Sequence, residues 1–187
     1  MNEAPLQDHG SGLRPEAEGW FVVNVRDTEW VTTEGGEKRP TGSDCSFESG
    51  AYEFEQLGFR IHVLPPGEPN GLYHAESKQE DFLVLHGECL LLVEGEERRL
   101  RQWDFVHCPP GTEHIFVGAG DGPCAILMVG ARGEDGTILY PVSEFAARHD
   151  ASVAVETTKP SEAYSAGFEP GRRGRPPYWD ELPWAEE

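Results

Sequence analysis

The chain has 187 residues, of which 15 are Lys or Arg and 34 are Asp or Glu, and its formal net charge is −19. A charge of this sign and size repels phosphate backbones and anionic membrane surfaces, so nucleic acid and membranes are not expected partners. Glycine and proline occupy 22 and 15 positions, a share too high for a helical bundle and without the period of collagen. A single domain of short strands and turns is therefore expected.

Neither a membrane span nor a signal peptide is expected. No apolar run approaches the roughly 20 residues that a spanning helix needs, and the first residues lack the basic and then apolar pattern of a leader. The cysteines are far apart in the sequence and form no C-x-x-C pair: Cys45, Cys89, Cys108 and Cys124. This favours reduced thiols in a cytoplasmic protein over a disulfide or zinc framework.

The first residues, 1–18, are polar and rich in turn-forming residues, which predicts a loose N-terminal arm. A strand is predicted over 20–25 and a charged loop over 32–42. Further strands are predicted over 58–64, 71–75, 81–86, 89–93, 98–101, 104–108, 114–117 and 124–129. Glu94 and Gly95 predict a hairpin turn between two of them. Short strands at this spacing, with no long helix between them, indicate an antiparallel sandwich or barrel.

After the last of these strands, Ser143 can cap a short helix over 144–149. Residues 151–187 form a tail rich in proline, glycine and glutamate. Its large aromatic residues Tyr178, Trp179 and Trp184 predict that its end docks, either on this subunit or on a neighbour. The expected organisation is an arm over 1–18, a β-barrel domain over 19–150 and a tail over 151–187.

Two segments carry the candidate chemistry. In the first, His74 and Glu76 are two residues apart and therefore leave the same face of a strand, and Glu80 opens the next strand. In the second, the turn 109–113 delivers His114 onto a further strand. Imidazoles and carboxylates that converge from neighbouring strands suit a borderline divalent metal ion with open coordination positions.

These two segments resemble the motifs of the cupin superfamily. The first family motif is G-x5-H-x-H-x3,4-E-x6-G, and this chain has His74-x-Glu76-x3-Glu80-x6-Gly87. The second is G-x5-P-x-G-x2-H-x3-N, and this chain has Pro109-x-Gly111-x2-His114. The resemblance covers about residues 58–130. It implies an all-β fold, the cupin-type double-stranded β-helix or jelly-roll barrel, which is commonly dimeric and holds a metal ion.

Carried over by position, the resemblance implies a ligand set of His74, Glu76, Glu80 and His114. Glu76 stands where the family has its second histidine, so its ligand role stays open. In the second motif, Trp103 stands in place of the opening glycine and Gly118 in place of the closing asparagine. In the first motif, no glycine lies at the family's distance before His74. Two carboxylates favour Mn²⁺ or Fe²⁺, while the Irving–Williams order allows Zn²⁺ or Ni²⁺ in a purified sample.

Two further residues are candidates for the wall of the pocket. Phe116 has the strand parity of His114 and is expected to line it. His62 shares a strand face with Arg60, and for His62 a surface position is an equal alternative. No catalytic residue is assignable from the sequence.

Because the cupin barrel hosts many reactions, three functions stay open. The first is a mononuclear-metal enzyme, an oxygenase or an isomerase, that acts on a small polar molecule inside the barrel. The second is a barrel that binds a small molecule or a metal ion without catalysis. The third, disfavoured by the negative charge and the scarcity of lysine, is a sugar-phosphate isomerase-like enzyme. In each case a homodimer is expected, since open sheet edges favour pairing.

Overall fold

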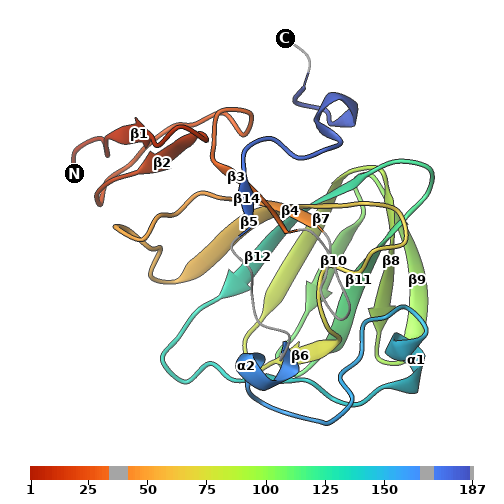
Figure 1. The fold of residues 1–187 in the computed structure, drawn as a ribbon. Coiled ribbons are helices and arrows are strands. Elements are labelled where there is room, and N and C mark those ends of the chain that lie inside the picture. Colours follow the sequence, from red (N-terminus) through yellow and green to blue (C-terminus); the bar gives the residue numbers. More distant parts are fainter. Residues whose placement is uncertain (34–41, 165–170, 186–187) are drawn as a thin grey trace.

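The structure is a computed structural model that describes residues 1–33, 42–164 and 171–185. Strands dominate it (Figure 1). The strands are β1 (Leu6–Asp8), β2 (Leu13–Pro15), β3 (Trp30–Thr33), β4 (Gly42–Ser46), β5 (Leu57–Leu64), β6 (His74–Glu76), β7 (Glu80–His86), β8 (Glu88–Val93), β9 (Glu96–Arg101), β10 (Phe105–Cys108), β11 (Glu113–Ala119), β12 (Cys124–Ala131), β13 (Ile138–Leu139) and β14 (Arg172–Arg173). The helices are α1 (Glu144–Ala147), α2 (Pro160–Ala163) and a 3₁₀ turn over Trp179–Glu181.

Two antiparallel sheets form the barrel. The larger has the strand order β10-β7-β12-β5-β4-β3-β14, and the smaller has the order β13-β6-β11-β8-β9. From β5 to β8 successive strands alternate between the sheets, since β5 and β7 lie in the larger sheet while β6 and β8 lie in the smaller one, and the strands from β10 to β13 alternate again (Figure 1). This is the arrangement of a double-stranded β-helix, so the fold class expected from the sequence is confirmed.

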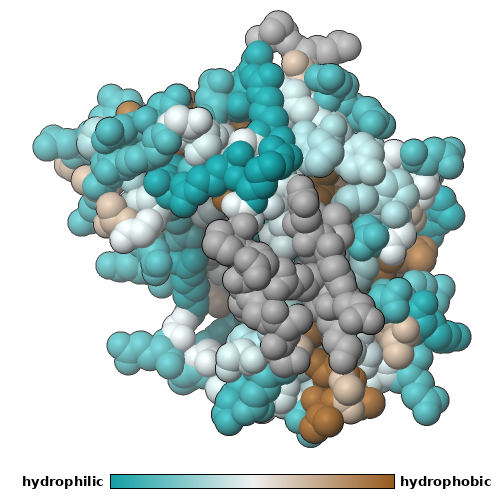
Figure 2. All heavy atoms as spheres, in the orientation of Figure 1, coloured by the Kyte–Doolittle hydropathy of each residue, from teal (hydrophilic) through white to brown (hydrophobic). Residues whose placement is uncertain are grey.

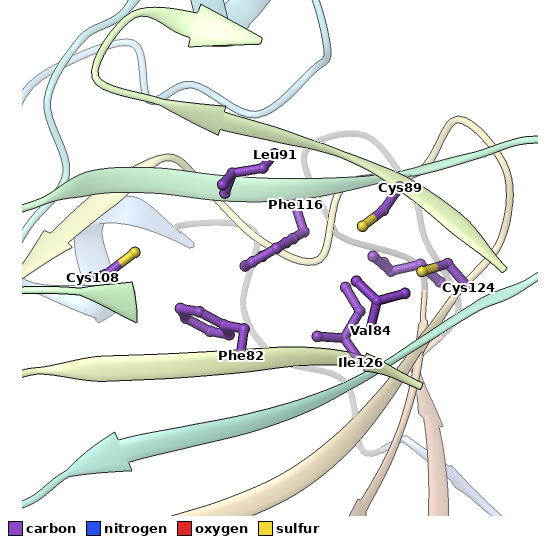
Figure 3. Close-up of a cluster of buried hydrophobic side chains, with 9 residues drawn as sticks. Phe82, Val84, Cys89, Leu91, Cys108, Phe116, Cys124 and Ile126 are labelled. Carbon is purple, nitrogen blue, oxygen red and sulfur yellow. The ribbon is translucent and has the colours of Figure 1, made fainter. Parts of the chain in front are cut away.

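The core lies between the two sheets. Phe82 and Val84 of β7 pack against Leu91 of β8 and Phe116 of β11, and the side chains point toward one another from facing ribbons (Figure 3). The rings of Phe82 and Phe116 have centroids 4.7 Å apart. Because this cluster is filled with buried apolar side chains, any space for a ligand must lie beside it rather than within it.

The hairpin turn predicted at Glu94 and Gly95 is confirmed. Val93 pairs with Glu96 in the register of β8 and β9, which leaves a two-residue loop. Both loop residues have a positive φ, 49° for Glu94 and 76° for Gly95. A two-residue loop with positive φ at both positions matches the twist of the flanking strands, which is why such turns are favoured in hairpins.

The N-terminal part of the chain differs from the expectation. Instead of a loose arm, β1 and β2 form a hairpin, and the carboxylate of Asp8 accepts hydrogen bonds from the backbone of Gly10 and Gly12 in its turn. The strand predicted over 20–25 was wrong: Trp20 makes only an isolated bridge with Glu3. Apolar character without a partner strand is not enough to make a strand.

The C-terminal part docks on its own chain. Ser143 caps α1 as predicted, with its hydroxyl accepting a hydrogen bond from the Ala146 amide, although the helix ends at Ala147. Further on, Trp179 packs edge-on against the buried ring of Trp30, with centroids 5.9 Å apart, and Trp184 stacks on the same ring at 5.6 Å. The tail therefore covers the barrel face around β3 (Figure 1).

The visible face of the molecule is mostly hydrophilic, with small hydrophobic spots rather than one broad apolar area (Figure 2). None of the helices in the described ranges has the length and apolar character to cross a membrane. The loop predicted over 32–42 lies almost wholly outside the described residues, which stop at Thr33 and resume at Gly42.

Candidate metal centre

A cavity of about 380 Å³ lies between the sheets, beside the packed cluster of Figure 3. Its wall comes from β5, β6, β7, β11 and β12 and from two tyrosines of the C-terminal part, Tyr140 and Tyr164. Three of the residues singled out in the sequence as metal ligands meet there: His74, Glu80 and His114.

The register of the strands brings these three residues together. His74 of β6 and His114 of β11 are directly paired across the smaller sheet. Glu80 begins β7 in the larger sheet, so it approaches from the opposite side. One ligand atom of each residue lies within 4.8 Å of the others, and the His114 Nε2 atom is 3.4 Å from Glu80 Oε2. The group therefore bridges the two sheets.

Both imidazoles are oriented by their own strands. The Nδ1 atom of His74 is 2.7 Å from the carbonyl oxygen of Leu72, and that of His114 is 3.0 Å from the carbonyl oxygen of Thr112. Because a carbonyl can only accept, Nδ1 carries the hydrogen in each ring and the lone pair is on Nε2. A backbone partner on the distal nitrogen is the usual way in which a protein fixes a metal-binding histidine.

Burial keeps these groups uncharged when no cation is present. It lowers the pKa of His74, and it lowers the pKa of His114 to about 4, with the neighbouring His74 adding to the effect. Burial also raises the pKa of Glu80 to about 8, and the Glu76 carboxylate adds to that rise while Arg60 opposes it. A divalent cation would reverse this balance, since it favours the ionised carboxylate and neutral imidazoles.

The donor set fits a first-row divalent metal ion. Two imidazole nitrogens and one carboxylate oxygen are the ligands of the two-histidine, one-carboxylate sites that hold iron(II) with open positions. His74, Glu80 and His114 could therefore hold a metal ion. The remaining coordination positions would face the cavity.

The other residues proposed from the sequence fall into different places. Glu76 lines the same cavity from β6 but is not part of the group of three. Phe116 is buried and lines the cavity, as expected. His62 does not line it. Instead it lies opposite Asp44 in the register of β4 and β5, and its Nδ1 atom is 2.5 Å from the Asp44 carboxylate.

Sequence reasoning missed the tyrosines of the wall. Tyr140 is buried, its ring centroid is 5.9 Å from that of His74, and Tyr164 meets it edge-on at 5.9 Å. Burial raises the pKa of Tyr140. Both residues lie outside the motif region, and no spacing rule links them to His74. Only the path of the chain after β13 brings them to the cavity.

The comparisons with known proteins concern the family and the fold. Residues 60–130 match the cupin domain family. No curated protein matches the chain significantly.

Among solved structures, a cupin 2 conserved barrel domain protein from Rhodopseudomonas palustris is 16% identical with a TM-score of 0.52, and the alignment covers 64% of this chain and 81% of that one. A cupin-like protein from Thermotoga maritima is 17% identical with a TM-score of 0.51, covering 67% and 96%. At these identities the likeness shows the fold alone.

A third similar structure, from Acidithiobacillus ferrooxidans, is provisionally described as a sugar phosphate isomerase. It is 22% identical with a TM-score of 0.49, and the alignment covers 53% of this chain. The aligned region spans 64% of that protein, less than two thirds of its length.

Proposed function

We propose, from the match of residues 60–130 to the cupin domain family, that the protein is a mononuclear-metal enzyme acting on a small polar molecule in the barrel cavity. The observation that carries the proposal is the buried group of His74, Glu80 and His114, with both Nε2 atoms left free by backbone hydrogen bonds. A divalent ion bound there would supply Lewis-acid polarisation of a substrate oxygen or, as iron, dioxygen chemistry.

Each residue of the group has a role in this proposal. His74 and His114 bind the ion through Nε2, and Glu80 supplies the third ligand and one negative charge. The carboxylate of Glu76 lines the same cavity and makes no hydrogen bond or ion pair to any other residue in the described ranges. We assign it as the residue that would supply a fourth ligand, and as a carboxylate on the cavity wall it could also accept a proton from the substrate.

The donor set also suggests the metal. With one or two carboxylates beside two imidazoles, the site is harder than an all-histidine site, which favours Fe²⁺ or Mn²⁺. Zn²⁺ or Ni²⁺ in a purified sample would follow from the Irving–Williams order and would not identify the working ion.

The second candidate function is a cupin that binds a small molecule or stores a metal ion without catalysis. The same cavity and donor set would serve it, so turnover is what separates the two. A sugar-phosphate isomerase-like activity has less support, because no lysine lines the described part of the cavity.

Elemental analysis tests the metal. The protein is purified without chelators or a nickel column, and we expect about one transition-metal ion per chain. In His114→Ala we expect the bound metal to fall below about a tenth of that value, whereas the surface variant His9→Ala keeps it. A wild-type protein that binds none of Fe²⁺, Mn²⁺ or Zn²⁺ in calorimetric titration contradicts the proposal. Oxygen uptake by the iron-loaded protein then separates oxygenase from isomerase or binder.

We also propose a homodimer that works in the cytoplasm. The four cysteines are free, buried thiols, which suits a reducing compartment. Strand β10 is an edge of the larger sheet, and Trp103 and Phe105 on or beside it are 67% and 64% exposed. Exposed apolar residues along an open edge favour pairing with a second copy.

A further inference from the structure

We propose that the cavity selects a small monocarboxylate that carries a second oxygen, as a hydroxy or oxo acid does, and that Arg60, Tyr140 and Asn70 hold its oxygens. This inference depends on the proposed function, because it names the substrate class of the same site. It follows from the hydrogen-bonding state of the three side chains on the cavity wall.

Arg60 is the weakly paired cation of the wall. Its side chain lines the cavity and is 61% exposed, and among the described residues its ion pair is with Asp44, at a long 3.8 Å. Arg132, which also lines the cavity, is closely paired with a carboxylate instead. Its guanidinium nitrogens donate to the Glu48 carboxylate at 2.6 and 2.8 Å and to the Phe54 carbonyl at 2.6 Å. An incoming anion would therefore pair with Arg60, since the Glu48 carboxylate already balances the charge of Arg132.

Tyr140 offers a second donor. It is 4% exposed, it lies against the His74 ring, and its hydroxyl makes no hydrogen bond with the described part of the chain. Its neighbour Tyr164 is engaged, because the Tyr164 oxygen accepts a hydrogen bond from the Leu72 amide at 3.1 Å. A nearly buried hydroxyl without a partner costs free energy unless a ligand satisfies it.

Asn70 offers a third hydrogen-bond donor. Its side-chain oxygen accepts a hydrogen bond from the Phe116 amide at 3.0 Å, and its backbone amide donates to the Phe116 carbonyl at 2.9 Å, so the side chain is held in place. Among the described residues its amide nitrogen reaches only the sulfur of Met128, at 3.9 Å, and a thioether is a weak acceptor. This donor is therefore available to a ligand in the cavity.

These donors define the chemistry of the ligand. Three N–H or O–H groups without strong acceptors call for a ligand rich in acceptor oxygens. The charged residues of the cavity wall also favour an anionic ligand. The carboxylates of Glu76 and Glu80 would balance a divalent cation, and Arg60 would then remain as a positive charge held only by its long ion pair with Asp44. The carboxylate of the ligand would neutralise Arg60. The second oxygen of the ligand could then accept a hydrogen bond from Tyr140, beside the His74 ring.

The size and remaining wall keep the ligand small. A volume of about 380 Å³ is near the lower end of the range for small-molecule sites. The other lining side chains include Phe82, Phe116 and Met128, which offer apolar contact but no charge. The cavity therefore suits a short acid with a small apolar body.

The test uses pyruvate and pyruvamide, which have the same shape but differ in charge. Calorimetric titration into the zinc-loaded protein avoids any redox reaction. We expect pyruvate to bind at least about tenfold more tightly than pyruvamide. Arg60→Gln should weaken pyruvate about tenfold and leave pyruvamide unchanged, whereas Tyr140→Phe should weaken both. The exposed Arg99→Gln is the matched control and should change neither.

Zinc titration of each variant separates the two proposals. If the wild-type protein binds no metal, the proposed function fails. If it binds zinc but the dissociation constant for pyruvate is above about 10 mM, the weakest affinity that titration resolves, the inference is wrong. Equal affinity for pyruvate and pyruvamide, or an unchanged preference in Arg60→Gln with normal zinc content, also overturns it.

Discussion

His74 and His114 are paired directly across β6 and β11, and their ring centroids are 5.0 Å apart. Each ring donates from Nδ1 to a carbonyl two residues earlier on its own chain. The two histidines therefore have the same orientation for the same local reason, and both Nε2 atoms are free to bind. The pairing turns two separate sequence motifs into one site.

Glu80 makes the metal-free protein sensitive to pH. Its pKa of about 8 in the folded protein lies above the ordinary value of 4.5, so the folded state holds this proton more tightly than the unfolded state. The contribution of Glu80 to stability is therefore fully present below pH 4.5 and is lost as the pH rises to about 8.

We expect metal-free Glu80→Gln, which cannot ionise, to escape this loss. Its free energy of unfolding relative to wild type should rise by about 4 kcal/mol between pH 4.5 and 8, while its metal binding is lost. Denaturant unfolding at several pH values measures this difference. A difference between the two proteins that does not change with pH would show that Glu80 is not held protonated in the fold.

Glu76 is tested by replacing it in two ways. If it is the fourth ligand, Glu76→Ala should weaken metal binding about tenfold, as the loss of one of four ligands, and Glu76→His should keep the metal and shift preference toward softer ions. Calorimetry with Mn²⁺ and Zn²⁺ measures both. Unchanged affinity in Glu76→Ala would remove this residue from the ligand set and leave the other three.

The docked tail should stabilise the barrel. Trp179 and Leu182 are buried against Trp30, and each contributes roughly 1.5–3 kcal/mol by burial. Deletion of residues 171–187 should lower the melting temperature by about 10 °C and shift the Trp30 fluorescence to the red. Trp179→Ala should reproduce part of the loss, and the exposed Asp180→Ala should not. An unchanged melting temperature in the deletion would mean that the tail contributes nothing.

The proposed dimer is tested at the edge of the larger sheet. Phe105→Glu places a charge on the exposed face of β10, and we expect it to convert the dimer to a monomer in light scattering. Val22→Glu is the control, since Val22 is also highly exposed but lies far from β10 in the sequence, next to the N-terminal hairpin. A wild-type protein with the mass of a monomer, or a Phe105→Glu variant that remains dimeric, rejects this interface.

The sequence by itself predicted strands corresponding to β5 through β12 and three residues of the candidate centre. Alternation along each strand sets which side chains share a face, and the turn at Glu94 and Gly95 sets the register of its hairpin. These are local properties, so they can be read from neighbouring residues. The spacing of the two motifs that resemble those of the cupins placed His74, Glu80 and His114 among the candidate ligands.

Only the tertiary structure decided what surrounds them. His62 shares a strand with Arg60, yet it bonds Asp44 on the adjacent strand while Arg60 lines the cavity. Tyr140 reaches His74 from far along the chain, and the tail packs on Trp30 within the same subunit. Such contacts depend on how sheets and loops pack in space. Strand periodicity holds no information about that packing, because it repeats every two residues and ends with the strand.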